Sequence, residues 1–179
     1  QSPKLIEDLV PKLLPLSTVQ KVLHNLLEEN VHIRDMRSIV DVLTEHAVHT
    51  QDASELTAIV RCSLGRSIVE QYFPAGAELQ VMSLHHELEN ILIQVLQTGG
   101  SQGAGIEPGL ADTLLKESRI AAQHQEKLGL PIILLVPGAI RSLLSKFLRR
   151  ALPQLRVLAH SEIPDSRKIK ITSVIGGNK

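Results

Sequence analysis

The sequence contains very few aromatic residues: Tyr72, Phe73 and Phe147 are its whole complement, and tryptophan is absent. A hydrophobic core therefore has to be built from leucine, isoleucine, valine and alanine. Cys62 is the only cysteine, which excludes an internal disulfide and suits a reducing compartment. Lysine plus arginine equal aspartate plus glutamate at 19 each, so no net field attracts nucleic acid or an anionic membrane. We expect any charged partner to bind a local patch of charged residues on the surface.

Long hydrophobic runs and targeting signals are also missing. The longest apolar stretches, such as residues 130–136, are far shorter than the roughly 20 residues of a membrane-spanning helix. No basic start followed by an apolar core marks a signal peptide, and the chain begins at Gln1, so we expect a cytosolic piece of a longer protein. Hydrophobic residues make up 43% of the 179 residues, which is enough for one or two globular domains.

Residues 1–75 are predicted to form an all-α helical subdomain. A capping box at Ser17 is expected to begin a helix whose apolar residues recur at helical spacing from residue 19 to residue 27. Asp35 and Asp52 are expected to cap two further helices, and Gly65 is a weak point in the last of them. The pattern changes after residues 73–76, where we place the domain boundary.

Residues 76–179 are predicted to form a small α/β subdomain, which makes the chain α+β overall. Strands are expected at residues 78–83, 131–136, 155–160 and 169–174. We expect a mixed four-stranded sheet, with an antiparallel final strand after the turn at Pro164 and Asp165. The helix from residue 138 should direct Phe147 inward and Arg141 outward. The glycine-rich stretch from Thr98 to Gly109 is expected to be a mobile loop.

Nothing in the sequence predicts catalysis, a cofactor or a bound metal. The glycines of residues 99–105 follow a helix and lack the lysine of a phosphate-binding loop. His85, His86, Glu87 and Glu89 could supply two metal ligands, but no further histidine or cysteine cluster lies nearby in sequence, so exposed polar residues are the favoured interpretation. No nucleophile with a neighbouring base is visible.

Two classes of binding function are open on the residues alone. The two helices around residues 30–34 are similar to a helix-turn-helix, which would suit a DNA-binding regulator with an α/β effector domain. However, residues 1–75 contain 7 basic and 10 acidic residues, which disfavours DNA. The other class is a protein-binding module. Its candidate surface for a partner or for a ring of subunits consists of basic residues: Arg34, Arg37, Arg149, Arg150, Arg156, Lys168 and Lys170.

Several runs resemble one known family. Residues 19–29, which end in Leu-Leu-Glu-Glu, and residues 31–35, which end in Ile-Arg-Asp, resemble the export-gate family of bacterial type III secretion that includes FlhA and InvA. The runs at residues 107–110, 152–158 and 162–164 follow in the family's order, and the end of the chain is more similar to the flagellar branch.

The resemblance implies a protein-transport role without catalysis. It places the chain in the cytoplasmic portion of an inner-membrane protein, in subdomains that assemble into a nonameric ring. The expected partners are export chaperones with their cargo and other export-apparatus proteins. Neither nucleic acid nor direct membrane contact by these residues is implied.

Overall fold

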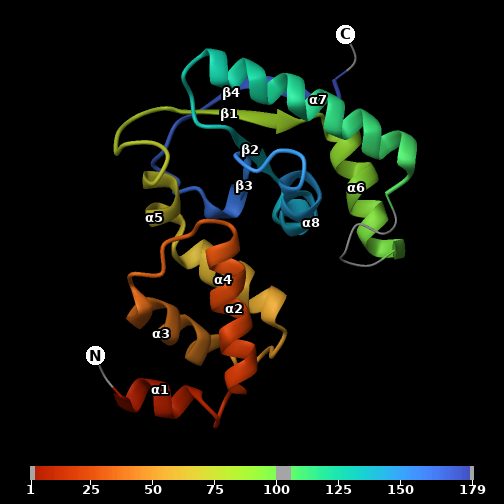
Figure 1. Cartoon of the computed structure of the whole chain (residues 1–179). Helices are drawn as coiled ribbons and strands as arrows, with labels where there is room; N and C mark the ends of the chain where they lie inside the picture. The colour runs from red at the N-terminus through yellow and green to blue at the C-terminus, as the bar shows by residue number, and fades with distance from the viewer. Residues whose placement is uncertain (1–2, 100–105, 178–179) are drawn as a thin grey trace. The chain divides into compact units, whose positions relative to one another are not determined.

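The computed structural model of the chain describes residues 3–99 and 106–177. It divides into two compact units, residues 1–71 and residues 72–179, each of which is treated separately below (Figure 1). The predicted boundary lies at residue 75, and the middle of the predicted mobile loop lies outside the described residues.

The first unit is helical. Its helices are α1 (Pro3–Leu9), α2 (Leu16–Glu28), α3 (Met36–His46), α4 (Ala53–Ser63) and α5 (Gly65–Glu70). Helix α4 packs against both α2 and α3, and α1 packs against α3. The core of this unit is aliphatic, with Leu26, Leu43 and Leu56 fully buried.

Two of the three predicted helix caps are confirmed. The Asp35 carboxylate accepts a hydrogen bond from the Ser38 backbone N–H, and Asp52 accepts bonds from the N–H groups of Ser54 and Glu55. The predicted cap at Ser17 is wrong, because α2 begins at Leu16 with Pro15 in the capping position and no side-chain cap. Proline fixes its own φ and lets the helix start directly after it. The chain also breaks between α4 and α5, at the predicted weak point.

The second unit is a parallel sheet with helices. Its elements are β1 (Leu79–Leu84), α6 (His86–Gly99), α7 (Pro108–Lys127), β2 (Ile133–Val136), α8 (Gly138–Arg149), β3 (Arg156–Ala159), the short 3-10 helix η1 (His160–Glu162) and β4 (Ile169–Ile175). The strand order is β3-β2-β1-β4, with β4 and β3 at opposite edges (Figure 1).

The prediction of a mixed sheet is wrong, because all three strand pairs are parallel. The turn at Pro164 does not form a hairpin with β3. Instead, residues 160–168 carry the chain to the opposite edge of the sheet, where β4 pairs with β1. Because this connection also returns to the end at which the other strands begin, β4 runs in their direction.

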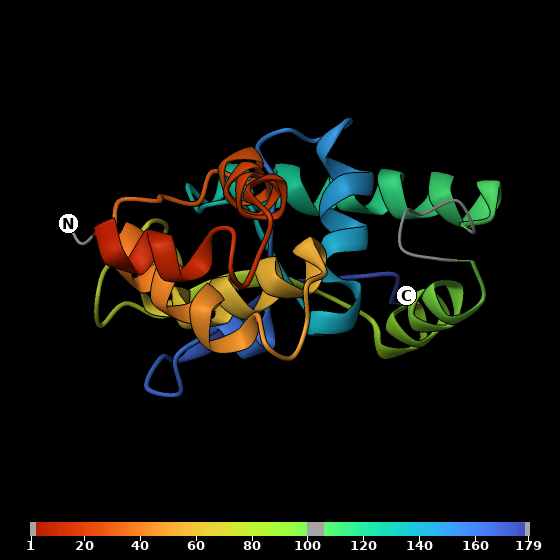
Figure 2. The ribbon, with the colours of Figure 1, turned by 90° about the horizontal axis from the view of Figure 1, so that it is seen from below.

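Helices α6, α7 and α8 share one hydrophobic core with one face of the sheet. The alternate strand residues Met82, Leu84 and Leu134 pack in this cluster with Leu92 of α6, Leu114 of α7 and residues 140–148 of α8. Figures 1 and 2 together show that α7 crosses α8 at a steep angle. Phe147 is only partly buried against this cluster, whereas Arg141, predicted to face solvent, is buried.

A buried glutamine ties α7 to the sheet. Gln125 is 0% exposed, and its Nε2 donates to the carbonyl oxygens of Gln80 and Pro131, each at 3.0 Å. Its Oε1 accepts from the Thr172 hydroxyl at 2.6 Å. One side chain thus bonds to β1, to the segment before β2 and to β4, which fixes the helix over the sheet.

Candidate protein-binding surfaces

One of the two predicted basic residues of the helical unit, Arg34, lines a small hollow. Arg34 and Arg37 are exposed, and residues 30–34 together with Leu27 line a hollow of about 290 Å³. Leu27 is 54% exposed. Gln71 holds this segment, because its Nε2 donates to the Asn30 carbonyl at 2.9 Å and its Oε1 accepts from the His32 N–H at 3.3 Å.

The predicted basic residues of the second unit do not form one surface. Arg149 and Arg150 end α8, and Arg156 begins β3 at one edge of the sheet. Lys168 and Lys170 lie on or beside β4 at the opposite edge, three strand spacings from β3, which is about 14 Å. The sequence places these cations close together in the chain, whereas the sheet separates them in space.

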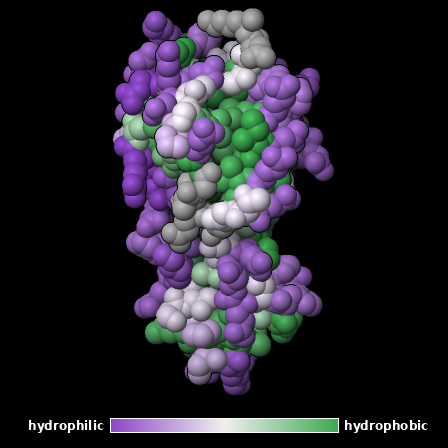
Figure 3. Space-filling model, turned by 90° about the vertical axis from the view of Figure 1, so that its right-hand side faces the viewer, coloured by the Kyte–Doolittle hydropathy of each residue, from purple (hydrophilic) through white to green (hydrophobic). Residues whose placement is uncertain are grey.

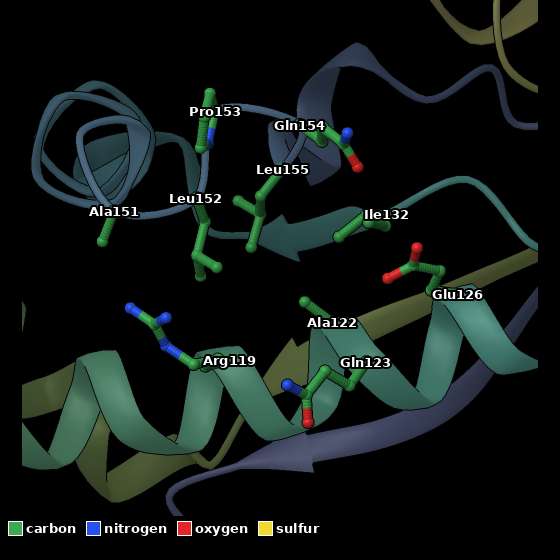
Figure 4. Close-up of a pocket in the computed structure, with 10 residues that line it drawn as sticks. All are labelled: Arg119, Ala122, Gln123, Glu126, Ile132, Ala151, Leu152, Pro153, Gln154 and Leu155. Atoms are coloured by element: carbon green, nitrogen blue, oxygen red, sulfur yellow. The ribbon is translucent and has the colours of Figure 1, made fainter.

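A small pocket with both polar and apolar walls lies between α7 and the turn from α8 to β3 (Figure 4). Its volume is about 250 Å³. Helix α7 contributes Arg119, Gln123 and Glu126, spaced so that they lie on one side of the helix, and Gln154 stands on the opposite wall. The remaining lining is mainly apolar: Ala122, Ile132, Ala151, Leu152, Pro153 and Leu155. Opposite charges at the two ends and amides between them suit a short peptide segment better than a compact hydrophobic ligand.

A larger groove runs between α6, α7 and the end of β4. Its volume is about 970 Å³. Ile91, Ile120 and Val174 line it, although they are 44%, 57% and 50% exposed. Figure 3, which faces the side on which α6 and α7 lie, shows hydrophobic residues gathered in a hollow of this unit. Exposed aliphatic side chains that converge on one groove are typical of a protein-interaction site.

This groove, which we call the α6–α7 groove, was not predicted from the sequence. One signal was available: Ile120 lies between the polar residues Arg119 and Gln123, on a part of α7 that would otherwise face water. Charged side chains line the groove as well, among them Glu87 of α6 and Lys116 and Glu117 of α7. The groove therefore combines exposed aliphatic side chains with charges of both signs.

One of the histidines considered as metal ligands, His85, caps a helix. His85 precedes α6, and its Nδ1 accepts a hydrogen bond from the Glu87 N–H at 3.3 Å, which caps the helix. The ring of His86 lies 4.3 Å from that of His85, centroid to centroid. Within residues 3–99 and 106–177, no three His, Cys, Asp or Glu side chains lie close enough together to hold a metal ion. Over the same ranges, no helix combines the length and apolar character needed to cross a bilayer.

Comparison with known proteins identifies the family. Residues 1–168 match the FHIPEP family, and the chain belongs to it. It is 55% identical over 176 residues to the flagellar biosynthesis protein FlhA of Yersinia enterocolitica, an alignment that covers 98% of this chain and 25% of the relative. The chain therefore spans about a quarter of the length of such relatives. The resemblance to the export-gate family of type III secretion is confirmed.

Solved structures agree with this assignment. One is the complex of the CdsV and CdsO proteins of Chlamydia pneumoniae, with a TM-score of 0.84 and 25% identity over 97% of this chain and 51% of that one. Another is the nonameric SctV-C of EPEC, with a TM-score of 0.77 and 26% identity over 96% of this chain and 52% of that one. Identity is thus higher to the flagellar relative than to these structures. Membership of this family of protein-transport components replaces the alternative of a DNA-binding regulator.

Proposed function

We propose that this chain is part of the cytoplasmic region of a flagellar protein-export gate, where it binds other proteins and catalyses no reaction. It works as one subunit of a ring that receives export chaperones with their cargo and components of the export apparatus. The high identity to a flagellar biosynthesis protein supports the flagellar role. The nonameric structure of SctV-C supports the ring.

The α6–α7 groove carries the binding part of this proposal. The solved complex of CdsV with CdsO is a precedent for a protein partner on a related chain. In the present chain, the groove supplies exposed aliphatic side chains that a partner would remove from water. Each fully covered aliphatic side chain contributes about 1.5–3 kcal/mol before the costs of association.

The test uses two matched substitutions in the full-length protein of a motile cell. Ile120 lines the groove, whereas Leu128, at the end of α7, is equally aliphatic, is 51% exposed and lies outside that lining. We expect Ile120→Asp to reduce secretion of flagellar proteins into the medium and swimming motility by at least about tenfold, because a carboxylate in the interface would be desolvated without a partner.

Leu128→Asp should leave secretion and motility within about twofold, since a surface change outside an interface has little effect. Thermal unfolding of both purified variants controls for misfolding. Normal secretion by a folded Ile120→Asp variant would remove the groove from the proposal. Normal secretion after deletion of the whole gene would refute the export function itself.

A further inference from the structure

The two outer strands of the sheet differ in how their free edges are treated. Strand β3 forms one edge and β4 forms the other. An outer strand has a row of backbone N–H and C=O groups that point away from the sheet, and another chain can pair with them unless they are covered. An edge is available to another chain only where these outward groups are not already hydrogen-bonded.

The β3 edge is closed by a buried ion pair. Because the Arg156 N–H donates to the Ile132 carbonyl, the backbone N–H and C=O groups of Arg156 point toward β2. The backbone groups of its neighbour Val157 therefore point outward, away from the sheet. Arg141 Nη1 donates to the outward Val157 carbonyl at 3.2 Å, and the outward Ala159 N–H donates to Glu162 Oε1 at 3.1 Å. The two side chains themselves approach to 3.7 Å, between Nε and Oε2, and they are 7% and 2% exposed.

The β4 edge is open. The Leu79 N–H donates to the Lys168 carbonyl and the His85 N–H donates to the Ile175 carbonyl, each at 2.8 Å, so these two carbonyls point toward β1. A bulge places Thr172 as an extra residue between the pairs Val81–Ile171 and Met82–Ser173. By alternation, the backbone groups that point outward are those of Ile169, Ile171 and Val174. No hydrogen bond joins them to another part of residues 3–99 and 106–177.

The same three residues also expose their side chains. Ile169, Ile171 and Val174 are 42%, 44% and 50% exposed, which is unusual for large aliphatic residues on one strand. Lys168 and Lys170 alternate with the two isoleucines and are exposed. A strand laid along this edge would therefore meet aliphatic and cationic side chains in turn, and cross-strand neighbours stabilise a sheet when aliphatic meets aliphatic and acid meets base.

We propose that the edge of β4 binds an extended segment of a partner protein, in which aliphatic and acidic residues alternate, as an added fifth strand of the sheet. Backbone hydrogen bonds from three residues supply affinity, and the two lysines select acidic side chains. The proposal does not depend on the function proposed above, because its test is direct binding.

Charge argues against a second copy of this chain as the occupant. Two β4 strands side by side would bring their lysines together, and like charges across a strand pair are destabilising. Lysines on an edge strand are a common defence against self-association. The same lysines favour an acidic strand. The edge therefore disfavours pairing with a second β4 strand and favours a partner of opposite charge.

The experiment uses the full chain and a synthetic peptide. The probe is a seven-residue peptide of alternating valine and glutamate, which matches the seven residues of β4, and its control has lysine in place of glutamate. Amide hydrogen exchange is followed residue by residue. We expect the acidic peptide to slow exchange at Ile169, Ile171 and Val174 by at least about tenfold, and the basic peptide to have no effect.

Variants test the backbone and the charge separately. Ile171→Pro removes an outward N–H that the native sheet does not use, so it should fold and weaken binding at least about tenfold; Ile171→Thr keeps the N–H and should bind normally. The variant with Lys168→Glu and Lys170→Glu should prefer the basic peptide, which keeps the proposal testable if the proline variant unfolds. Unchanged exchange at saturating acidic peptide would overturn the proposal. So would protection of Val157 and Ala159 instead, or dimerisation of the chain through the same three amides.

Discussion

The buried pair of Arg141 and Glu162 leads to a graded prediction about the stability of the α/β unit. The two residues are 5% and 3% exposed overall, so neither charge is hydrated. Glu162 both faces the guanidinium and accepts the Ala159 N–H. Glu162→Leu removes both interactions and leaves a buried arginine without its counter-charge. We expect it to lower the free energy of unfolding by about 3–5 kcal/mol.

Two companion variants separate charge from hydrogen bonding. Glu162→Gln keeps an acceptor for the Ala159 N–H and removes only the charge, so it should cost less than Glu162→Leu. The double variant, Arg141→Met with Glu162→Leu, removes both charges and should regain the part of the loss that comes from the buried charge, because an uncharged pair has no desolvation cost. What it cannot regain is the pairing of the Ala159 N–H, worth about 1–3 kcal/mol for a group left buried and unpaired.

The assay is urea unfolding combined with amide exchange of β3. Exchange localises the loss to this unit, which matters because the chain has two units and need not unfold in one step. Glu162→Leu should increase the amide exchange rate of Ala159, and Glu162→Gln should increase it less. The reasoning is refuted if Glu162→Leu stays within about 1 kcal/mol of the unsubstituted protein, or if the double variant is less stable than the single one.

Gln125, Asp35 and Gly176 should also be sensitive to substitution. Gln125→Leu should cost about 1–3 kcal/mol in urea unfolding, because it leaves the part-buried Gln80 carbonyl unpaired, while the Pro131 carbonyl keeps the Ile133 N–H and the Thr172 hydroxyl keeps the Val81 carbonyl. Exposed Gln123→Leu should cost less than about 0.5 kcal/mol. Side-chain and backbone hydrogen bonds from Ser38 lower the pKa of Asp35, so its charge stabilises the fold at neutral pH. The stability advantage over Asp35→Asn should be complete above about pH 3.9 and should shrink as the pH falls from there through the lowered pKa, measured by thermal unfolding. Gly176→Ala should cost more than Gly76→Ala in the same measurement, since both have φ near +80° (+81° and +82°) but only at Gly176 would the new Cβ meet a leucine methyl, at 2.7 Å.

Local patterns in the sequence predicted the elements well, and tertiary partners explain most of the errors. Asp35 and Asp52 cap their helices because capping depends only on residues two or three positions further on. The helical period predicts Arg141 in solvent because it lies beside the apolar stripe of its helix, whereas its buried partner, Glu162, lies beyond β3 in the chain. No helical period reveals a partner at that distance.

Sheet topology was the other source of error. Periodicity identifies a strand but carries no information about its neighbours or its direction. The turn at Pro164 suggested a hairpin, and the six basic residues from Arg149 to Lys170 suggested one patch. Once β4 pairs with β1 instead of β3, the patch is divided between two edges. The α6–α7 groove depends on the same pairing, because the end of β4 forms one of its walls.

Strand β4 takes part in both proposed surfaces, and one of its residues, Val174, belongs to both. Val174 lines the α6–α7 groove and also presents outward backbone groups at the sheet edge. Ile120 belongs to the groove alone and Ile171 to the edge alone. Three substitutions can therefore show whether the two surfaces are separate sites.

If the groove and the edge are separate sites, a substitution in the groove should not change the affinity for the acidic seven-residue peptide. We expect Ile120→Asp to leave the peptide affinity within about twofold, and Ile171→Pro and Val174→Asp each to weaken it at least about tenfold, the latter because a carboxylate repels the acidic strand. In the secretion assay, Val174→Asp should resemble Ile120→Asp, since both place a charge on the groove wall. A peptide affinity that falls with Ile120→Asp would mean that the peptide lies in the groove, and the edge of β4 would then lose its claim to a separate partner.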